Sequence, residues 1–101
     1  MIIYNVTINV DDSINEEWLR WMKETHIPAV MHTGLFQSHK IFRLLSRQAE
    51  EEGVTYAIQY ACEDIELYEK YQAEFAGALQ AETEKRYAGH YVAFRTLLEE
   101  L

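Results

Sequence analysis

The sequence predicts a single α+β domain in which a four-stranded antiparallel sheet carries two helices on one face. Four segments alternate apolar and polar residues with a period of two, as half-buried strands do. Two longer segments, which begin near Ser13 and Asp64, repeat apolar residues at the helical period. The strand-like segments are 2–10, 35–46, 54–62 and 90–98. The whole chain therefore has the element order β-α-β-β-α-β.

The first strand has the cleanest alternation in the chain. One of its faces carries Ile2, Tyr4, Val6, Ile8 and Val10, and the other carries Ile3, Asn5, Thr7 and Asn9. This pattern predicts that one face packs on a core while the other is left for a different neighbour.

The first helix is expected to begin at a capping box. Ser13 and Glu16 have the spacing at which two side chains satisfy the free N–H groups of a first helical turn. On a helical wheel, one arc of roughly 100° then collects the apolar side chains and places the charged ones opposite. That arc comprises Ile14, Trp18, Trp21, Met22 and Thr25. The helix is therefore amphipathic.

A proline sets the expected end of this helix. Pro28 has no N–H group and disfavours helical geometry at Ile27. We therefore expect the regular helix to end near His26, with room for one further turn through Met31. Gly34 follows as a turn residue.

The second half of the chain predicts a hairpin, a helix and a last strand. The second and third strands are joined by the polar, acidic segment 47–53, which is longer than a minimal hairpin loop. A second amphipathic helix begins at Asp64 and runs to about Arg86, and Gly77 is the expected place for a kink or a break. Gly89 is expected to stop this helix before the last strand.

With right-handed crossovers, this element order gives the ferredoxin-like arrangement, which leaves one sheet face open. On the two central strands the open face carries Ile3, Asn5, Thr7, Asn9, Thr55, Ala57, Gln59 and Ala61. None of them is charged, although charged residues make up 26% of the chain. Small neutral side chains let a second sheet approach closely, so we expect a homodimer through this face. The alternative is a solvent face that is merely small and polar.

The composition excludes several partners. With 9 basic against 17 acidic residues, the chain carries a net charge of −8, which disfavours nucleic acids and anionic membrane surfaces. Its single cysteine, Cys62, cannot form an internal disulfide or a CxxC site, and no HExxH motif occurs. We therefore expect no metal site and no cofactor. Neither a signal peptide nor an apolar run of membrane-spanning length is evident, which predicts a cytoplasmic protein.

The best candidate for a functional residue is His26, at the rim of the apolar arc. A neutral imidazole there could act as a general base or orient a ligand, whereas the structural alternative is capping of the last helical carbonyls. Aromatic rings and a thioether beside it would suit a small, largely apolar molecule, although such a stripe is also ordinary core. The predicted lining of this ligand site is Trp18, Trp21, Met22 and, where the site opens into a barrel, Asn5 and Gln59.

Two short motifs carry a family resemblance. "HIP" at 26–28 ends the first helix, and "GLF" at 34–36 leads into the second strand. With the element order, they resemble the dimeric α+β barrel superfamily, which includes antibiotic-biosynthesis monooxygenases, haem-degrading monooxygenases, muconolactone isomerases, EthD-like proteins and stress-responsive barrel proteins. The whole chain is most similar to a short bacterial family catalogued as a domain of unknown function. This resemblance implies the ferredoxin-like fold and a dimer, but no reaction.

Three functions stay open on the sequence. The first is a homodimer that binds a small molecule, and the second is a cofactor-independent monooxygenase or isomerase with His26 as base. The third is a structural or regulatory dimer with no ligand site. Haem degradation is disfavoured, because the resemblance places a histidine on the late helix and residues 64–88 contain none.

Overall fold

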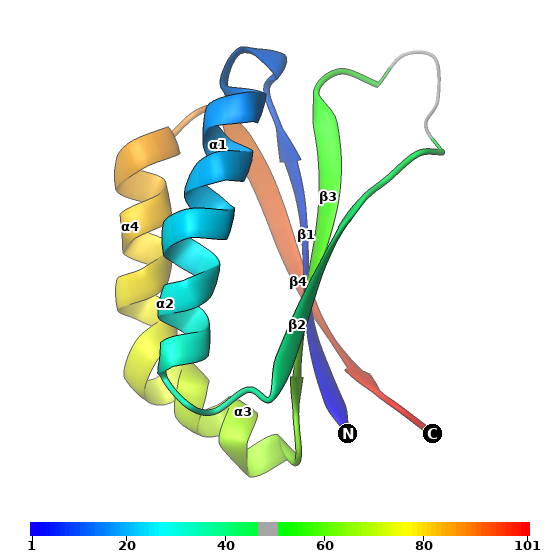
Figure 1. Cartoon of the computed structure of the whole chain (residues 1–101), viewed down its shortest axis with the longest axis vertical. Helices are drawn as coiled ribbons and strands as arrows, with labels where there is room; N and C mark the ends of the chain where they lie inside the picture. Colours follow the sequence, from blue (N-terminus) through cyan, green and yellow to red (C-terminus); the bar gives the residue numbers. More distant parts are fainter. Residues whose placement is uncertain (47–50) are drawn as a thin grey trace.

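A computed structural model describes residues 1–46 and 51–101. In chain order its regular elements are β1 (Ile2–Val10), a 3-10 turn (Asp12–Ile14), α1 (Asn15–Trp21), α2 (Ile27–His32), β2 (Ser38–Arg43), β3 (Val54–Cys62), α3 (Ile65–Tyr71), α4 (Gly77–Tyr87) and β4 (Tyr91–Glu99). A π-helical turn (Met22–His26) joins α1 to α2, and a second one (Gln72–Ala76) joins α3 to α4. The fold thus has two long helices, and both cover the same face of the sheet (Figure 1).

The sheet confirms the predicted ferredoxin-like topology. Within the described residues its strand order is β2-β3-β1-β4, and every neighbouring pair is antiparallel. In the central pair, Tyr4 lies opposite Tyr60 and Val6 opposite Ile58. The helices therefore face the apolar side that the alternation predicted.

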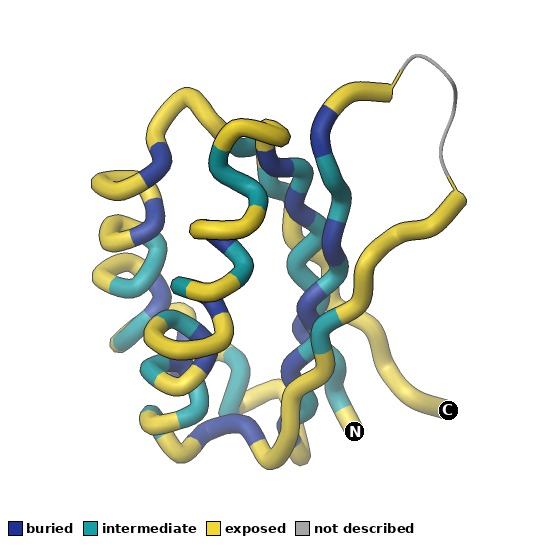
Figure 2. Tube along the Cα trace, turned by 45° about the horizontal axis from the view of Figure 1, so that its top comes forward, coloured by how far each residue is buried: buried dark blue, intermediate teal, exposed yellow. Residues whose placement is uncertain are grey.

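Aromatic rings form much of the core between the helices and the sheet. Tyr4 lies at the centre of this layer, with ring centroids 5.3 to 6.2 Å from those of Phe36, Tyr60, Tyr68 and Tyr71. Figure 2 shows that the buried positions follow the inner sides of strands and helices. Burying each large side chain of this kind contributes roughly 1.5–3 kcal/mol.

The first helix continues through Pro28 to His32, so the structure has the further turn that was left open through Met31 and not an end near His26. The π turn explains the difference. The Ile27 N–H donates to the Met22 carbonyl, five residues back, and α2 then starts afresh at Ile27. Pro28 consequently falls in the first turn of α2, where a missing N–H group costs little.

Two local predictions were wrong. Ser13 lies inside the 3-10 turn, and no side chain caps the start of α1. The second strand is shorter than 35–46, because Leu35 and Phe36 turn into the core and pairing begins at Ser38. By contrast, Asp64 does begin its helix, and its carboxylate accepts a hydrogen bond from the Leu67 N–H at 3.0 Å. The predicted loop 47–53 lies partly outside the described residues.

The open sheet face is apolar at its edges. The strand register extends the predicted central set with Ser38, Lys40 and Phe42 of β2 and with Val92, Phe94, Thr96 and Leu98 of β4. Val92 is 72% exposed and Phe94 is 60% exposed. Among the strand residues described on this face, Lys40 alone is charged.

Candidate functional site

The sheet divides the six predicted site residues into two groups. Trp18, Trp21, Met22 and His26 lie on the helical side, where Trp18 and Met22 are buried and the other two are half-buried. Asn5 and Gln59 are cross-strand neighbours on the open face. There the Asn5 amide donates to the hydroxyls of Thr7 and Thr96. One chain therefore does not bring the six residues together.

His26 has an unusual environment for a histidine. Burial, together with the positive charge of Arg95, lowers the pKa of its imidazole from 6.5 to about 4. Its ring centroid lies 5.2 Å from that of Trp21. Among the described residues, neither ring nitrogen has a hydrogen-bond partner. At neutral pH the ring is therefore uncharged, with one N–H donor and one acceptor unused.

The two tryptophans have different surroundings. Trp18 is fully buried with its ring centroid 5.0 Å from that of Tyr56, and its indole N–H has no acceptor in the described part of the chain. Trp21 packs edge-on against Tyr87 and lies under the guanidinium of Arg86, at 5.5 Å. Trp18 is thus a core residue, whereas Trp21 connects His26 with the surface.

Arg95 is a residue that the sequence analysis missed. It lies opposite Val6 on the helical side of the edge strand β4, and it is exposed. Its charge acts on His26 and on the hydroxyls of Tyr4, Tyr71 and Tyr91. The alternation of "YVAFR" at 91–95 could have revealed it, because this pattern puts the arginine on the same face as inward-facing residues.

All three of these phenols have a raised pKa and are protonated at neutral pH. Burial raises the pKa of Tyr4 and of Tyr71, and the charge of Arg95 opposes this rise in both. Burial and a hydrogen bond to Glu84 raise the pKa of Tyr91 to about 12. Tyr91 already donates its proton to Glu84, so the neutral O–H groups near Arg95 that can donate to a further partner are those of Tyr4 and Tyr71.

Arg95 also lines a groove between α4 and β4. Its volume is about 390 Å³, and the helical wall contributes Gly77, Ala81 and Glu84. Tyr91 lies in the strand wall, and its hydroxyl donates to the Glu84 carboxylate at 2.6 Å. His26 does not line this groove. Arg95 does line it, and the charge of Arg95 acts on His26, so Arg95 links the groove to the histidine.

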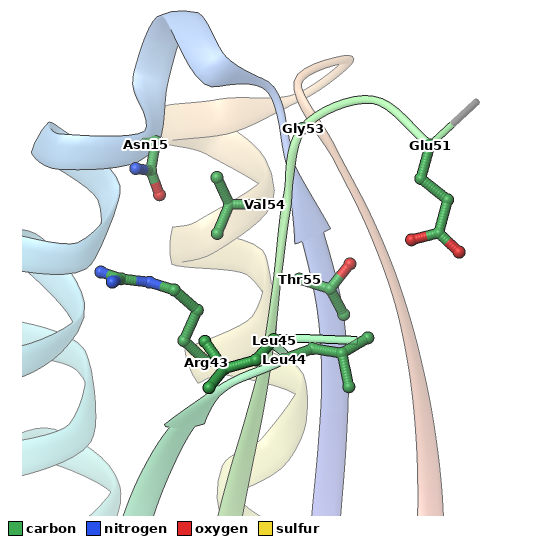
Figure 3. Close-up of a pocket in the computed structure, with 8 residues that line it drawn as sticks. All are labelled: Asn15, Arg43, Leu44, Leu45, Glu51, Gly53, Val54 and Thr55. Atoms are coloured by element: carbon green, nitrogen blue, oxygen red, sulfur yellow. The ribbon is translucent and has the colours of Figure 1, made fainter. Parts of the chain in front are cut away.

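A second cavity, of about 410 Å³, lies at the opposite edge of the sheet (Figure 3). Figure 3 shows the Arg43 side chain reaching toward the helix that carries Asn15. The Arg43 guanidinium lies 5.7 Å from the centre of the Tyr56 ring. None of the predicted site residues lines this cavity, so we place the candidate site at His26 and Arg95.

Residues 1–46 and 51–101 contain neither a metal-binding cluster nor a membrane-spanning helix. No cluster of histidine, cysteine or acidic side chains there could hold a metal ion. Likewise, none of the helices described is long and apolar enough to cross a bilayer.

Solved structures with the same fold are numerous, but their sequences are distant. HapK from Hahella chejuensis superposes with a TM-score of 0.72 at 14% identity, covering 100% of this chain and 93% of that one. An EthD family protein from Bacillus halodurans gives a TM-score of 0.68 at 13% identity, with both chains covered completely. SnoaB from Streptomyces nogalater, a cofactor-independent oxygenase, gives 0.63 at 14% identity over 98% of this chain and 91% of its own. These likenesses establish the fold.

Sequence comparison identifies the family directly. No curated protein matches the chain. Residues 1–101 match the family described as Domain of unknown function (DUF4286). The protein therefore belongs to the DUF4286 family and has the fold of the dimeric α+β barrel proteins.

Proposed function

We propose that this protein is a homodimer, joined through its open sheet faces, that binds a small, largely apolar molecule between its helices and its sheet. The observation that carries the proposal is His26, a half-buried neutral imidazole whose ring nitrogens have no partner among the described residues. Neither nitrogen is among the fully buried, unpartnered side-chain atoms described, so both stay accessible to water or to a ligand that can accept or donate a hydrogen bond.

The surroundings of His26 support an aromatic or otherwise apolar ligand. Trp21 lies beside the imidazole, with Met22 and Trp18 on the same face of the helix. Open space for entry lies between α4 and β4, where Arg95 reaches toward the same interior. Ligand sites with mostly apolar walls and a few polar groups commonly combine these features.

The open face supports the second half of the proposal. Phe94 and Val92 are mostly exposed, and Phe42, Leu44 and Leu98 are about half exposed. Exposed apolar residues along both edges of an otherwise small and nearly uncharged sheet face favour an interaction site, and a twofold dimer is the commonest way to cover it. In such a dimer Asn5 and Gln59 would face the space between two sheets, which gives them a role apart from His26.

A cofactor-independent monooxygenase or isomerase with His26 as base is the second candidate. It is favoured by the structural likeness to SnoaB, which is described as a cofactor-independent oxygenase. However, a pKa of about 4 makes the imidazole a weak base near neutral pH. The ring is better suited to hydrogen bonding with a bound molecule, which favours binding over proton abstraction.

The binding proposal can be tested with an uncharged two-ring probe, 2-naphthamide. Titration into ¹⁵N-labelled protein should shift the amide resonances of Trp21, His26 and Arg95 in a saturable manner. A His26→Leu variant, which keeps the volume but loses both nitrogens, should bind the probe more weakly by several-fold, since one hydrogen bond contributes about 1 kcal/mol. Absence of saturable shifts at millimolar probe would contradict the proposal and favour a structural or regulatory dimer without a site.

A further inference from the structure

We propose that the ligand carries a single carboxylate and that Arg95, in the groove between α4 and β4, is its counter-ion. This inference rests on the proposed function, because it names the chemical class of the molecule that the same interior would bind.

The first support is that Arg95 lacks an acidic partner. The chain has 17 acidic residues and 9 basic ones, so carboxylates are in excess. Nevertheless, no described carboxylate lies within ion-pairing distance of its guanidinium. Glu84 lines the same groove, but its carboxylate already accepts the Tyr91 hydroxyl at 2.6 Å. The positive charge is therefore available to a bound anion.

The second support is the excess of donors around this charge. The hydroxyls of Tyr4, Tyr71 and Tyr91 all lie close enough to Arg95 to feel its charge. A guanidinium has five N–H donors in a planar fork and no acceptor. The protonated phenols of Tyr4 and Tyr71 add O–H donors beside it, whereas Tyr91 already donates its proton to Glu84. Such a set of groups recognises an acceptor-only anion and discriminates against a cation.

The third support is the number of positive charges. One guanidinium matches one carboxylate through two parallel hydrogen bonds. A phosphate dianion would need further positive charge, whereas among the described residues the other ionisable side chains lining the groove are Glu84 and Tyr91. In a chain of net charge −8, a dianion would also be repelled at long range. The groove therefore favours a monocarboxylate.

Small residues make room for the apolar part of such a molecule. Gly77, Ala81 and Ala93 line the groove, and a side-chain carbon added at Gly77 would meet nothing within 4 Å. The volume of about 390 Å³ lies within the range of small-molecule sites. A two-ring aromatic carboxylate would place its rings along α4 and its charge against β4.

The test compares 2-naphthoate with 2-naphthamide, which has nearly the same shape but no charge. Affinities are measured by ¹⁵N amide shifts for the wild-type chain, for Arg95→Gln and for Arg43→Gln. Arg43 is the matched control, because it also faces the helices from an edge strand and packs on a tyrosine ring. Circular dichroism of each variant checks that the fold is retained.

We expect wild-type protein to bind 2-naphthoate about tenfold more tightly than 2-naphthamide, as a charge-assisted hydrogen bond allows. Arg95→Gln should abolish this preference, whereas Arg43→Gln should leave it unchanged. Equal binding of both probes, or a preference that survives in Arg95→Gln, overturns the carboxylate inference while the proposed function stands. Failure of both probes to bind overturns both.

Discussion

His26 takes its properties from its neighbours rather than from a motif. The helix places it beside Trp21, the surrounding layer removes water, and Arg95 adds a repelling charge from the far strand. These three contributions come from segments that are distant in the sequence. The candidate residue itself could be chosen from the chain alone, because it lies at the rim of an apolar arc. Its low pKa and its proximity to Arg95 could not be predicted from the sequence, because they depend on which strand lies beneath the helix.

The low pKa of His26 predicts acid sensitivity. Folding lowers this pKa from 6.5 to about 4, so the unfolded chain binds the proton more tightly than the folded chain does. The stabilising contribution is therefore complete above about pH 6.5 and is lost progressively as the pH falls toward 4. Between pH 7 and pH 5 we expect the wild-type free energy of unfolding to fall by about 2 kcal/mol more than that of His26→Gln.

Urea unfolding of both proteins at the two pH values measures this difference. The other three histidines are present in both chains, so their contributions cancel. Equal losses in the two proteins would mean that His26 titrates normally in the folded state.

The two long helices begin in different ways, although each has an acceptable capping sequence. Asp64 accepts a hydrogen bond from Leu67 and caps α3, whereas Ser13 lies within a 3-10 turn and caps nothing. At the start of α1, a different contact holds the chain. The Tyr56 hydroxyl donates to the Asn15 side chain at 2.5 Å and ties the helix to β3. A tertiary contact thus replaces the local cap.

Alanine substitutions at these two positions should therefore differ in their effect. Asp64→Ala removes a carboxylate that satisfies a helical N–H group and should lower the free energy of unfolding by about 1 kcal/mol. Ser13→Ala should change it by less than about 0.5 kcal/mol, as expected for an exposed position without a specific interaction. Chemical denaturation at pH 7 measures both free energies of unfolding. An equal loss in Ser13→Ala would show that Ser13 does cap the first helix.

The two central strands were the most predictable elements, and the helix interior was the least. The bounds of β1 and β3 follow from a strict alternation, because a pleated strand with one buried face leaves little freedom. Pro28 left the helix end undecided between His26 and Met31, and a π turn just before it lets the helix restart and reach His32. In a π turn a carbonyl accepts its hydrogen bond from the N–H group five residues later instead of four. No residue pattern in the chain predicts where this change of hydrogen bonding occurs.

At the scale of the whole molecule, the sheet is a partition between two chemical environments. Its helical side holds the aromatic core, His26 and Arg95, and its open side holds small polar residues bordered by exposed apolar ones. The alternation and the element order predicted the open side correctly, and the dimer inferred from its lack of charge stays a prediction. The apolar edges supplied by Phe42, Val92 and Phe94 became visible once the register was known.

The proposed dimer can be disrupted at one of these edges. Phe94→Lys places a charge on the open face and should convert a homodimer, twice the 11.9 kDa chain mass, into a monomer. Ile65→Lys is the control, since Ile65 is an exposed apolar residue on α3, away from this face. Light scattering coupled to gel filtration at micromolar concentration gives both masses. A wild-type monomer, or a Phe94→Lys dimer, would exclude the proposed interface.

The single cysteine offers a way to follow how this structure opens. Cys62 is fully buried at the end of β3, where its sulfur donates to the Asp64 carbonyl, and burial raises the pKa of its thiol. A thiol reagent can reach it only when the end of the sheet separates from the start of α3. The rate of Cys62 alkylation in native buffer therefore reports how often this junction unfolds locally, with no label added to the chain.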